Sequence, residues 1–201
     1  MKRVAVFGLA LAGEAAARAL VARGLDVVLS DDVIVEEHRR LAHELGCTII
    51  PVTTDADMNV FLDGVDVLVP APGVAPHHRV IVEALVHNVS VRTEIDIAYE
   101  WEQHRSGGPR PILGVTGTDG KTTTTMIAAA LLRGGGRSVG EVGNTDLPFM
   151  AAIDQPFDAF VVECSSFRLQ FTDVFRCDAS VWLNLAPDHL DWHGSIEKYA
   201  E

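Results

Sequence analysis

One glycine-rich segment constrains the fold of this chain more than any other feature. It follows the apolar run Ile112–Val115, precedes a helical pattern, and consists of Thr116, Gly117, Thr118, Asp119, Gly120, Lys121, Thr122 and Thr123. A strand, a glycine-rich loop and a helix in this order are typical of α/β domains, in which loop amides and the helix N-terminus bind phosphate. The strict phosphate-loop pattern requires glycine where Val115 stands, although Gly114, Gly117 and Gly120 supply flexibility in another register. The segment predicts a nucleoside triphosphate site rather than a structural turn.

Two side chains within this segment and one beyond it would complete the site. Lys121 would neutralise the β- and γ-phosphates of ATP, and the Thr122 hydroxyl would ligate Mg²⁺. Glu163 ends the apolar run Asp158–Glu163. If that run forms a strand parallel to Ile112–Thr116, Glu163 emerges at the edge where open α/β sheets bind ligands, and Mg²⁺ prefers carboxylate ligands. The alternative is a solvated glutamate at a strand end.

The order of apolar runs and helical patterns predicts an α/β fold in two parts. Residues 1–104 are expected to form a doubly wound, Rossmann-like N-terminal domain, 105–111 a Gly- and Pro-containing linker, and 112–201 the start of a P-loop ATPase-type α/β central domain. The expected strands are Arg3–Phe7, Asp26–Ser30, Thr48–Val52, Asp66–Val69, Ser90–Arg92, Ile112–Thr116, Ala159–Glu163 and Ala179–Leu185. The expected helices are Gly13–Arg23, Val33–Leu45, His77–His87, Thr93–His104 and Lys121–Arg133.

The turn Gly8–Gly13 follows the first expected strand as a dinucleotide-binding turn would. Asp31 or Asp32, about 20 residues further on, is placed to contact a ribose. Ala10 stands where the middle glycine of that pattern belongs, and its methyl group hinders the close approach of a pyrophosphate. Three readings stay open: NAD or FAD, a different nucleotide ligand, and a tight turn with only a structural role.

Charge and apolar patterning exclude several functions. The formal net charge is −12, from 28 acidic and 16 basic residues, and Lys and Arg do not cluster, which argues against binding to a nucleic-acid backbone. No apolar run approaches the roughly 20 residues that span a bilayer, and the N-terminal apolar run breaks too early for a signal peptide. We therefore expect a cytoplasmic protein without a membrane span. Cys47, Cys164 and Cys177 are too widely spaced to predict a disulfide framework or a zinc site.

Polar residues also gather after the apolar run Ala179–Leu185: Asn184, Asp188, His189, Asp191 and His193. No cysteine accompanies the two histidines, and the helical zinc motif is lacking, so zinc is not expected there. A single histidine is more often a packing or surface residue than a ligand, and both readings of His189 stay open.

Four motifs in order resemble those of the Mur ligases. They are the phosphate loop Thr116–Thr123, the pair Gly143-Asn144, the run Glu163-Cys164-Ser165-Ser166-Phe167-Arg168-Leu169, and the run Asn184-Leu185-Ala186-Pro187-Asp188-His189-Leu190-Asp191. The Glu-x-Ser-Ser-Phe-x-Leu form is most similar to the member that adds D-glutamate to UDP-N-acetylmuramoyl-L-alanine in peptidoglycan synthesis. The resemblance implies an ATP-dependent reaction through an acyl phosphate.

The resemblance also implies roles for individual residues. Lys121, Glu163 and His189 would be catalytic, with Thr122 and Glu163 serving one Mg²⁺ and His189 a second. The residues implied to bind the UDP-linked substrate are Leu9, Ala10, Leu11, Ala12, Asp31, Asp32, Ala71, Pro72, Gly73, Asn144, Ser165 and His189. A monomer is expected.

Other functions remain as alternatives. Another Mur-type ligase, using a different amino acid or adding glutamate to folate, would share the phosphate loop. A P-loop ATPase or nucleotide-binding module would explain that loop but not the run from Asn184, and a nicotinamide-dependent dehydrogenase would explain only the first strand and turn. Tyr199 is followed by Ala200 and Glu201, without the lysine that the family places four positions after this tyrosine. We therefore expect the chain to be a fragment that does not catalyse ligation alone.

Overall fold

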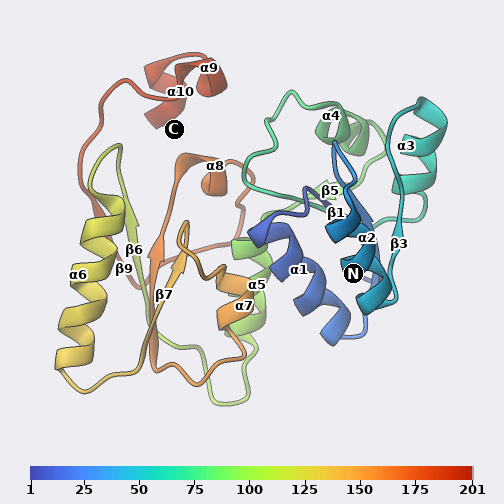
Figure 1. The fold of residues 1–201 in the computed structure, drawn as a ribbon. Helices are drawn as coiled ribbons and strands as arrows, with labels where there is room; N and C mark the ends of the chain where they lie inside the picture. The colour runs from blue at the N-terminus through green and yellow to red at the C-terminus, as the bar shows by residue number, and fades with distance from the viewer. Residues whose placement is uncertain (201) are drawn as a thin grey trace. The chain divides into compact units, whose positions relative to one another are not determined.

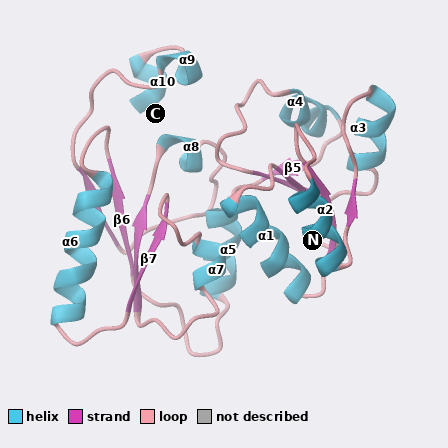
Figure 2. Ribbon diagram, in the orientation of Figure 1, coloured by secondary structure: helices cyan, strands magenta, loops and turns pink. Residues whose placement is uncertain are grey.

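The computed structural model describes residues 1–200, which form two compact units (Figures 1 and 2). The first unit comprises Met1–Ile97 and the second begins at Ala98, so the division falls inside helix α5 (Glu94–Gln103). Each unit is built on its own parallel sheet. The predicted α/β fold, a Rossmann-like unit followed by a second α/β unit, is confirmed.

The first unit is a five-stranded sheet with the strand order β3-β2-β1-β4-β5. The strands are β1 (Arg3–Phe7), β2 (Asp26–Ser30), β3 (Thr48–Ile49), β4 (Val67–Pro70) and β5 (Ser90–Val91). The helices that alternate with them are α1 (Leu11–Ala22), α2 (Glu36–Leu45), α3 (Asp55–Leu62) and α4 (Arg79–Val86). The chain leaves β1 toward β2 on one side and later reaches β4 on the other, which makes the β1/β4 border the switch point of the sheet.

The central strands are apolar because helices cover both faces of a parallel sheet. Every residue of β4 is buried, as are four of the five in β1 and in β2. These strands therefore read as continuous apolar runs without the alternation of a half-exposed sheet. That pattern made β1 and β2 predictable to the residue.

Helix α3 is an element that the sequence prediction missed. Its amphipathic signal is weak, but Thr54 and Asp57 form a capping box, in which Asp57 N donates to Thr54 Oγ1 at 3.2 Å and Thr54 N donates to Asp57 Oδ2 at 2.9 Å. The pair Thr-x-x-Asp was the available signal. The predicted strand Thr48–Val52 was also too long: β3 ends at Ile49, and Pro51 has no amide hydrogen to continue the ladder.

The second unit is a four-stranded parallel sheet with the order β7-β8-β6-β9. Its strands are β6 (Ile112–Thr116), β7 (Val139–Gly143), β8 (Ala159–Glu163) and β9 (Ala179–Trp182). Its helices beyond α5 are α6 (Lys121–Gly134), α7 (Phe149–Ala152), α8 (Ser166–Leu169), α9 (Leu190–His193) and α10 (Ile196–Ala200). Helix α6 packs on one face of the sheet, where Ala129 meets Val115, Val139 and Val161.

Two strands of this unit differ from the prediction. Strand β7 was missed because two glycines and a glutamate interrupt its apolar pattern. Strand β9 ends at Trp182, three residues before the predicted end, and all four of its residues are exposed because it lies at the edge of the sheet. Burial therefore constrains the length of β9 less than it constrains the length of the central strands.

Arg110, within the predicted linker 105–111, is a buried anchor of the second unit. Its guanidinium pairs with Glu102 of α5 at 2.6 Å, donates to Ile153 O at 2.5 Å and lies 4.5 Å from the centre of the Phe160 ring. Both charged side chains are almost fully buried, so each compensates the desolvation of the other. These contacts explain why the end of α5 belongs to the second unit. In the described part of the chain, no helix is long and apolar enough to cross a membrane.

Candidate functional site

The carboxyl edge of the second sheet brings together the segments that the sequence singled out. Val115 of β6 lies opposite Glu163 of β8, and Glu163 lies opposite Gly143 of β7. On the other side of β6, Thr116 lies opposite Trp182 of β9. The phosphate loop, Glu163, Asn144 and the run from Asn184 therefore leave the sheet at one edge, where open α/β sheets bind their ligands.

Glycine is required at two positions of the loop. Gly117 has φ 136° and Gly120 has φ 84°, both in the left-handed region that side chains disfavour. A Cβ atom on Gly117 would also lie 3.1 Å from both the N and O atoms of Asn184. Lys121, the first residue of α6, turns its Nζ back onto the loop and donates to Gly117 O at 2.7 Å and Thr118 O at 2.8 Å.

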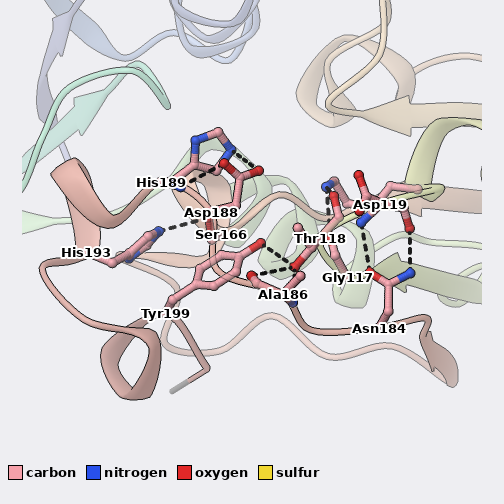
Figure 3. A network of polar contacts seen from close by, with 11 residues as sticks. Gly117, Thr118, Asp119, Ser166, Asn184, Ala186, Asp188, His189, His193 and Tyr199 are labelled. Atoms are coloured by element: carbon pink, nitrogen blue, oxygen red, sulfur yellow. Dashed lines mark hydrogen bonds and ion pairs between the residues drawn. The ribbon is translucent and has the colours of Figure 1, made fainter.

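Asn184 holds the loop from the end of β9 (Figure 3). Its side chain accepts from Asp119 N at 2.9 Å and donates to Asp119 O at 3.0 Å. Its carbonyl oxygen accepts from Thr118 N at 3.1 Å. Three hydrogen bonds therefore fix the backbone of the loop at Thr118 and Asp119. The sequence placed Asn184 among the polar residues of this edge without assigning it a role.

The Thr118 hydroxyl is a second point of attachment (Figure 3). It lies 3.2 Å from Ala186 O, 3.0 Å from Ala186 N, which donates to it, and 3.2 Å from the Tyr199 hydroxyl of α10. Nothing in the local sequence pairs Tyr199 with Thr118, because 81 residues separate them. The strand order of the sheet and the return of the chain through α9 and α10 bring them together.

Glu163 has one bonded and one unbonded carboxylate oxygen. The residue is 1% exposed, and Oε1 accepts from Asn144 Nδ2 at 3.1 Å. Oε2 is buried without a hydrogen-bond partner among the described residues. Gly143 has φ 98°, and a Cβ atom there would lie 2.4 Å from Glu163 O. The absence of a side chain at Gly143 therefore lets the ends of β7 and β8 lie close together. An unsatisfied buried carboxylate oxygen is costly, and a bound cation would satisfy it.

Ser165 and His189 lie in different surroundings. Ser165 is buried, and its hydroxyl has no hydrogen-bond partner in the described structure. His189 is exposed and has φ 50°, and it lies 3.4 Å from the Asp188 carboxylate. Its ring is tilted by 53° to that of Phe167, at 4.7 Å between ring centres. Among residues 1–200, no three His, Cys, Asp or Glu side chains cluster as ligands of one metal ion. A cation at this edge would therefore need hydroxyl, water or phosphate oxygens besides Glu163.

His193 faces the same edge. Its Nε2 lies 3.0 Å from Ser166 Oγ (Figure 3). Its ring stacks on Phe167 with an interplanar angle of 13°. Partial burial lowers the pKa of His193 below its ordinary value, and the neighbouring His189 acts in the same direction. The neutral imidazole is therefore favoured at this position.

The first unit has its own carboxyl edge, where the residues predicted from the Gly8–Gly13 turn lie. Asp31, after β2, accepts from Leu9 N at 2.6 Å, and Asp32 pairs with His78 at 3.1 Å. Ala71, after β4, donates through its backbone to Phe7 O at 2.7 Å. The ends of three adjacent strands thus meet beside the switch point. His78 was not predicted, and its distance from Asp32 in the sequence hid the pair.

Glycine is again required where the backbone approaches closely. A Cβ atom on Gly8 would lie 2.7 Å from Ala71 Cβ, and one on Gly13 would lie 1.7 Å from Gly8 O. Gly73, in contrast, has open space around it. The two required glycines bracket the turn that contains Leu9, Ala10, Leu11 and Ala12, with α1 beginning at Leu11.

Comparison with known proteins finds relatives over nearly the whole chain. Residues 115–201 match the family model described as the Mur ligase middle domain. UDP-N-acetylmuramoylalanine--D-glutamate ligase of Syntrophus aciditrophicus is 37% identical over 98% of this chain, and that of Thermobifida fusca is 39% identical over 99%. Over nearly its whole length, the chain is similar to the Mur ligases.

The match to these Mur ligases covers only part of their length. The chain spans 43% of each of the two relatives. The crystal structure of a UDP-N-acetylmuramate:L-alanyl-gamma-D-glutamyl-meso-diaminopimelate ligase from Neisseria meningitides aligns with 100% of this chain and 66% of its own, at a TM-score of 0.60 and 20% identity. That likeness shows that the Mur ligase fold extends over both units.

Proposed function

We propose that the chain carries the nucleotide-binding part of an ATP-dependent ligase that joins D-glutamate to UDP-N-acetylmuramoyl-L-alanine in peptidoglycan precursor synthesis. The observation that carries the proposal is the buried Oε2 of Glu163, which has no hydrogen-bond partner among the described residues. It lies at the same sheet edge as the phosphate loop and Lys121. The names of the relatives at 35–39% identity supply the two substrates. The four sequence motifs occur in the order in which the Mur ligases carry them, which supports the proposal.

The phosphate loop would bind ATP through its amides and Lys121. The Lys121 ammonium group already lies over the loop, bonded to two neutral carbonyl oxygens. Phosphate oxygens are stronger partners for it, because they carry negative charge that attracts the ammonium group, whereas the carbonyl oxygens are neutral. Asn184 and Thr118 keep the loop amides in place for this exchange.

Glu163 and Thr122 fit a role as Mg²⁺ ligands. Glu163 offers a buried oxygen without a hydrogen-bond partner, and Thr122 offers an exposed hydroxyl in the first turn of α6. When bound, Mg²⁺ would neutralise charge on the phosphate oxygens. Asn144, which donates to Glu163, would orient that carboxylate as well as contact the UDP-linked substrate. His189 would serve a second Mg²⁺, and the Ser165 hydroxyl would face the substrate.

The first unit would bind the uridine diphosphate group. Asp31 is engaged with Leu9 N, so its part is to shape the turn, whereas the Asp32 carboxylate is 67% exposed and available to the ligand. The turn and the Ala71–Gly73 loop flank the switch point, where doubly wound sheets bind nucleotides.

Calorimetric titration tests the two halves of this function separately. The full chain would be titrated with UDP-N-acetylmuramoyl-L-alanine, UDP and NADH, and then with ATP in the presence and absence of Mg²⁺. Binding of the muramoyl nucleotide and of ATP, but not of NADH, is expected. Binding of NADH alone would overturn the ligase function, and ATP binding without any muramoyl nucleotide binding would leave only the phosphate loop assignment.

A further inference from the structure

His78 joins two segments of the first unit that are 46 positions apart in the sequence. It is the residue before helix α4, and its Nε2 lies 3.1 Å from Oδ1 of Asp32, which follows β2. Its ring also lies 5.1 Å, between ring centres, from that of Phe7, the last residue of β1. The His78 side chain therefore contacts the ends of two adjacent strands at the carboxyl edge of the sheet.

The hydrogen bonds of His78 fix which ring nitrogen carries the hydrogen atom. The Val80 amide donates to His78 Nδ1 at 3.2 Å, so Nδ1 is the acceptor of the ring. A neutral imidazole has one acceptor and one donor nitrogen, which leaves Nε2 to donate to Asp32 Oδ1. One side chain thus caps the first turn of α4 and holds a carboxylate on the neighbouring loop.

The other carboxylate of this loop, that of Asp31, is engaged with the backbone. Its Oδ2 accepts from Leu9 N at 2.6 Å, and its Oδ1 accepts from Val33 N at 3.3 Å. Asp32 is bonded to His78 through Oδ1, and its side chain is largely exposed, so Oδ2 can accept from a ligand. Of the two carboxylates, that of Asp32 is therefore the one that a nucleotide can reach.

The pair of Asp32 and His78 orients a side chain more than it stabilises the fold. Pairs as exposed as this one contribute little to the free energy of unfolding, because water competes for both groups. An aspartate side chain that moves freely loses rotamer freedom when it binds a ligand, and a side chain that is already held loses less. The bond from His78 thus favours ligand binding by Asp32 without itself contacting the ligand.

We propose that His78 is a positioning residue for the uridine diphosphate group, an inference that rests on the function proposed above for the first unit. By holding Asp32 Oδ1, His78 directs Oδ2 toward a hydrogen-bond donor of the uridine. Uridine offers donors of two kinds, the ribose hydroxyls and the N3–H group of uracil. Cytidine carries an acceptor at N3 instead, so a carboxylate that faces this position also selects against cytidine.

Two substitutions separate the two hydrogen bonds of His78. His78→Asn keeps a short acceptor for Val80 N, because asparagine is a favoured N-cap residue, but it cannot reach Asp32. His78→Gln places a donor near the position of Nε2 and loses the short acceptor. We expect the affinity for UDP to fall about fivefold in His78→Asn and to stay within about twofold in His78→Gln. The urea midpoint should fall in His78→Gln only, so a purely structural role would give the reverse order.

Calorimetric titration of the full chain with UDP, 2′-deoxy-UDP and CDP identifies the donor that Asp32 meets. If that donor is the ribose 2′-hydroxyl, 2′-deoxy-UDP should bind more weakly than UDP, and the difference should shrink in His78→Asn. If the donor is uracil N3–H, CDP should show this behaviour. In Asp32→Ala, adding His78→Asn should not lower the UDP affinity further, because His78 acts through Asp32.

His87→Asn, at the other end of α4, is the matched control and should bind UDP as the unchanged chain does. If UDP binds the unchanged chain and His78→Asn equally well, the inference about His78 is wrong while the proposed function stands. It is also wrong if His78→Asn weakens UDP binding as much in Asp32→Ala as in the unchanged chain. Failure of the unchanged chain to bind any uridine nucleotide would overturn both the inference and the function proposed for the first unit.

Discussion

Asn184 and Asp119 are joined by two hydrogen bonds between one side chain and one backbone, at 2.9 Å from Asp119 N and 3.0 Å to Asp119 O. The amide group of asparagine matches a peptide group in this pairing, because it offers one acceptor and one donor side by side. Asn184, which lies just after β9, thereby positions the loop that follows β6. We regard Asn184 as a positioning residue for the phosphate loop.

Replacing Asn184 should therefore weaken nucleotide binding without unfolding the protein. Each lost hydrogen bond contributes roughly 0.5–1.5 kcal/mol, so Asn184→Ala should raise the dissociation constant of ATP about tenfold. Asn184→Asp keeps the acceptor but places a carboxylate beside Asp119 O, and it should be no better than alanine. Calorimetric titration with ATP and Mg²⁺ measures the effect. An unchanged affinity in both variants would mean that the loop holds its shape without Asn184.

Removing the charge of Glu163 should reduce the gain in ATP affinity that Mg²⁺ provides. Glu163→Gln keeps the acceptor for Asn144 Nδ2 but removes the anionic ligand. We expect the ratio of ATP affinities with and without Mg²⁺ to fall about tenfold, a change of about 1.4 kcal/mol. The matched control is Glu141→Gln on neighbouring β7, whose carboxylate pairs with Arg133 and should not affect the ratio. If Glu141→Gln and Glu163→Gln behaved alike, Glu163 would not be the Mg²⁺ ligand.

The turn after β1 should tolerate no side chain at Gly13. Alanine is favoured over glycine inside a helix by about 1 kcal/mol, but a Cβ atom on Gly13 would lie 1.7 Å from Gly8 O. We expect the clash to dominate, and Gly13→Ala to destabilise the first unit by about 3 kcal/mol in urea unfolding. Gly73→Ala, at the same edge with open space, should stay within about 0.5 kcal/mol of the unchanged protein. Equal stability of the two variants would contradict the close approach of Gly8 and Gly13.

The second unit should lose stability as the pH falls below the ordinary pKa of histidine. The pKa of His193 is lowered from 6.5 in the folded protein, so the unfolded chain binds a proton first. The contribution of His193 is therefore present above pH 6.5 and is lost as the pH falls through the folded-state value. Urea midpoints measured between about pH 5 and pH 8 should decline toward acid less steeply in His193→Gln than in the unchanged protein. Identical slopes would show that His193 is not responsible.

The sequence by itself determined the central buried strands, because their signals are contiguous, and it predicts the phosphate loop for the same reason. The buried strands β1, β2 and β6 are contiguous apolar runs, and Gly117 and Gly120 lie within four residues of Lys121. The signal failed where it was diluted: in β7, with its glycines, and in α3, which is weakly amphipathic. Local composition cannot identify a strand whose place in the sheet is set by its neighbours.

Only the tertiary structure decided which of these residues act together. Thr118 meets Tyr199, Asp119 meets Asn184, and Glu163 meets Asn144 because the strand order β7-β8-β6-β9 brings distant segments to one edge. In the same way, the order β3-β2-β1-β4-β5 brings Asp31 to the Leu9 amide. Strand order depends on which buried faces pack together across the whole unit, and no single stretch of sequence encodes it. The sequence predicts the chemistry of each residue, whereas its partners required the fold.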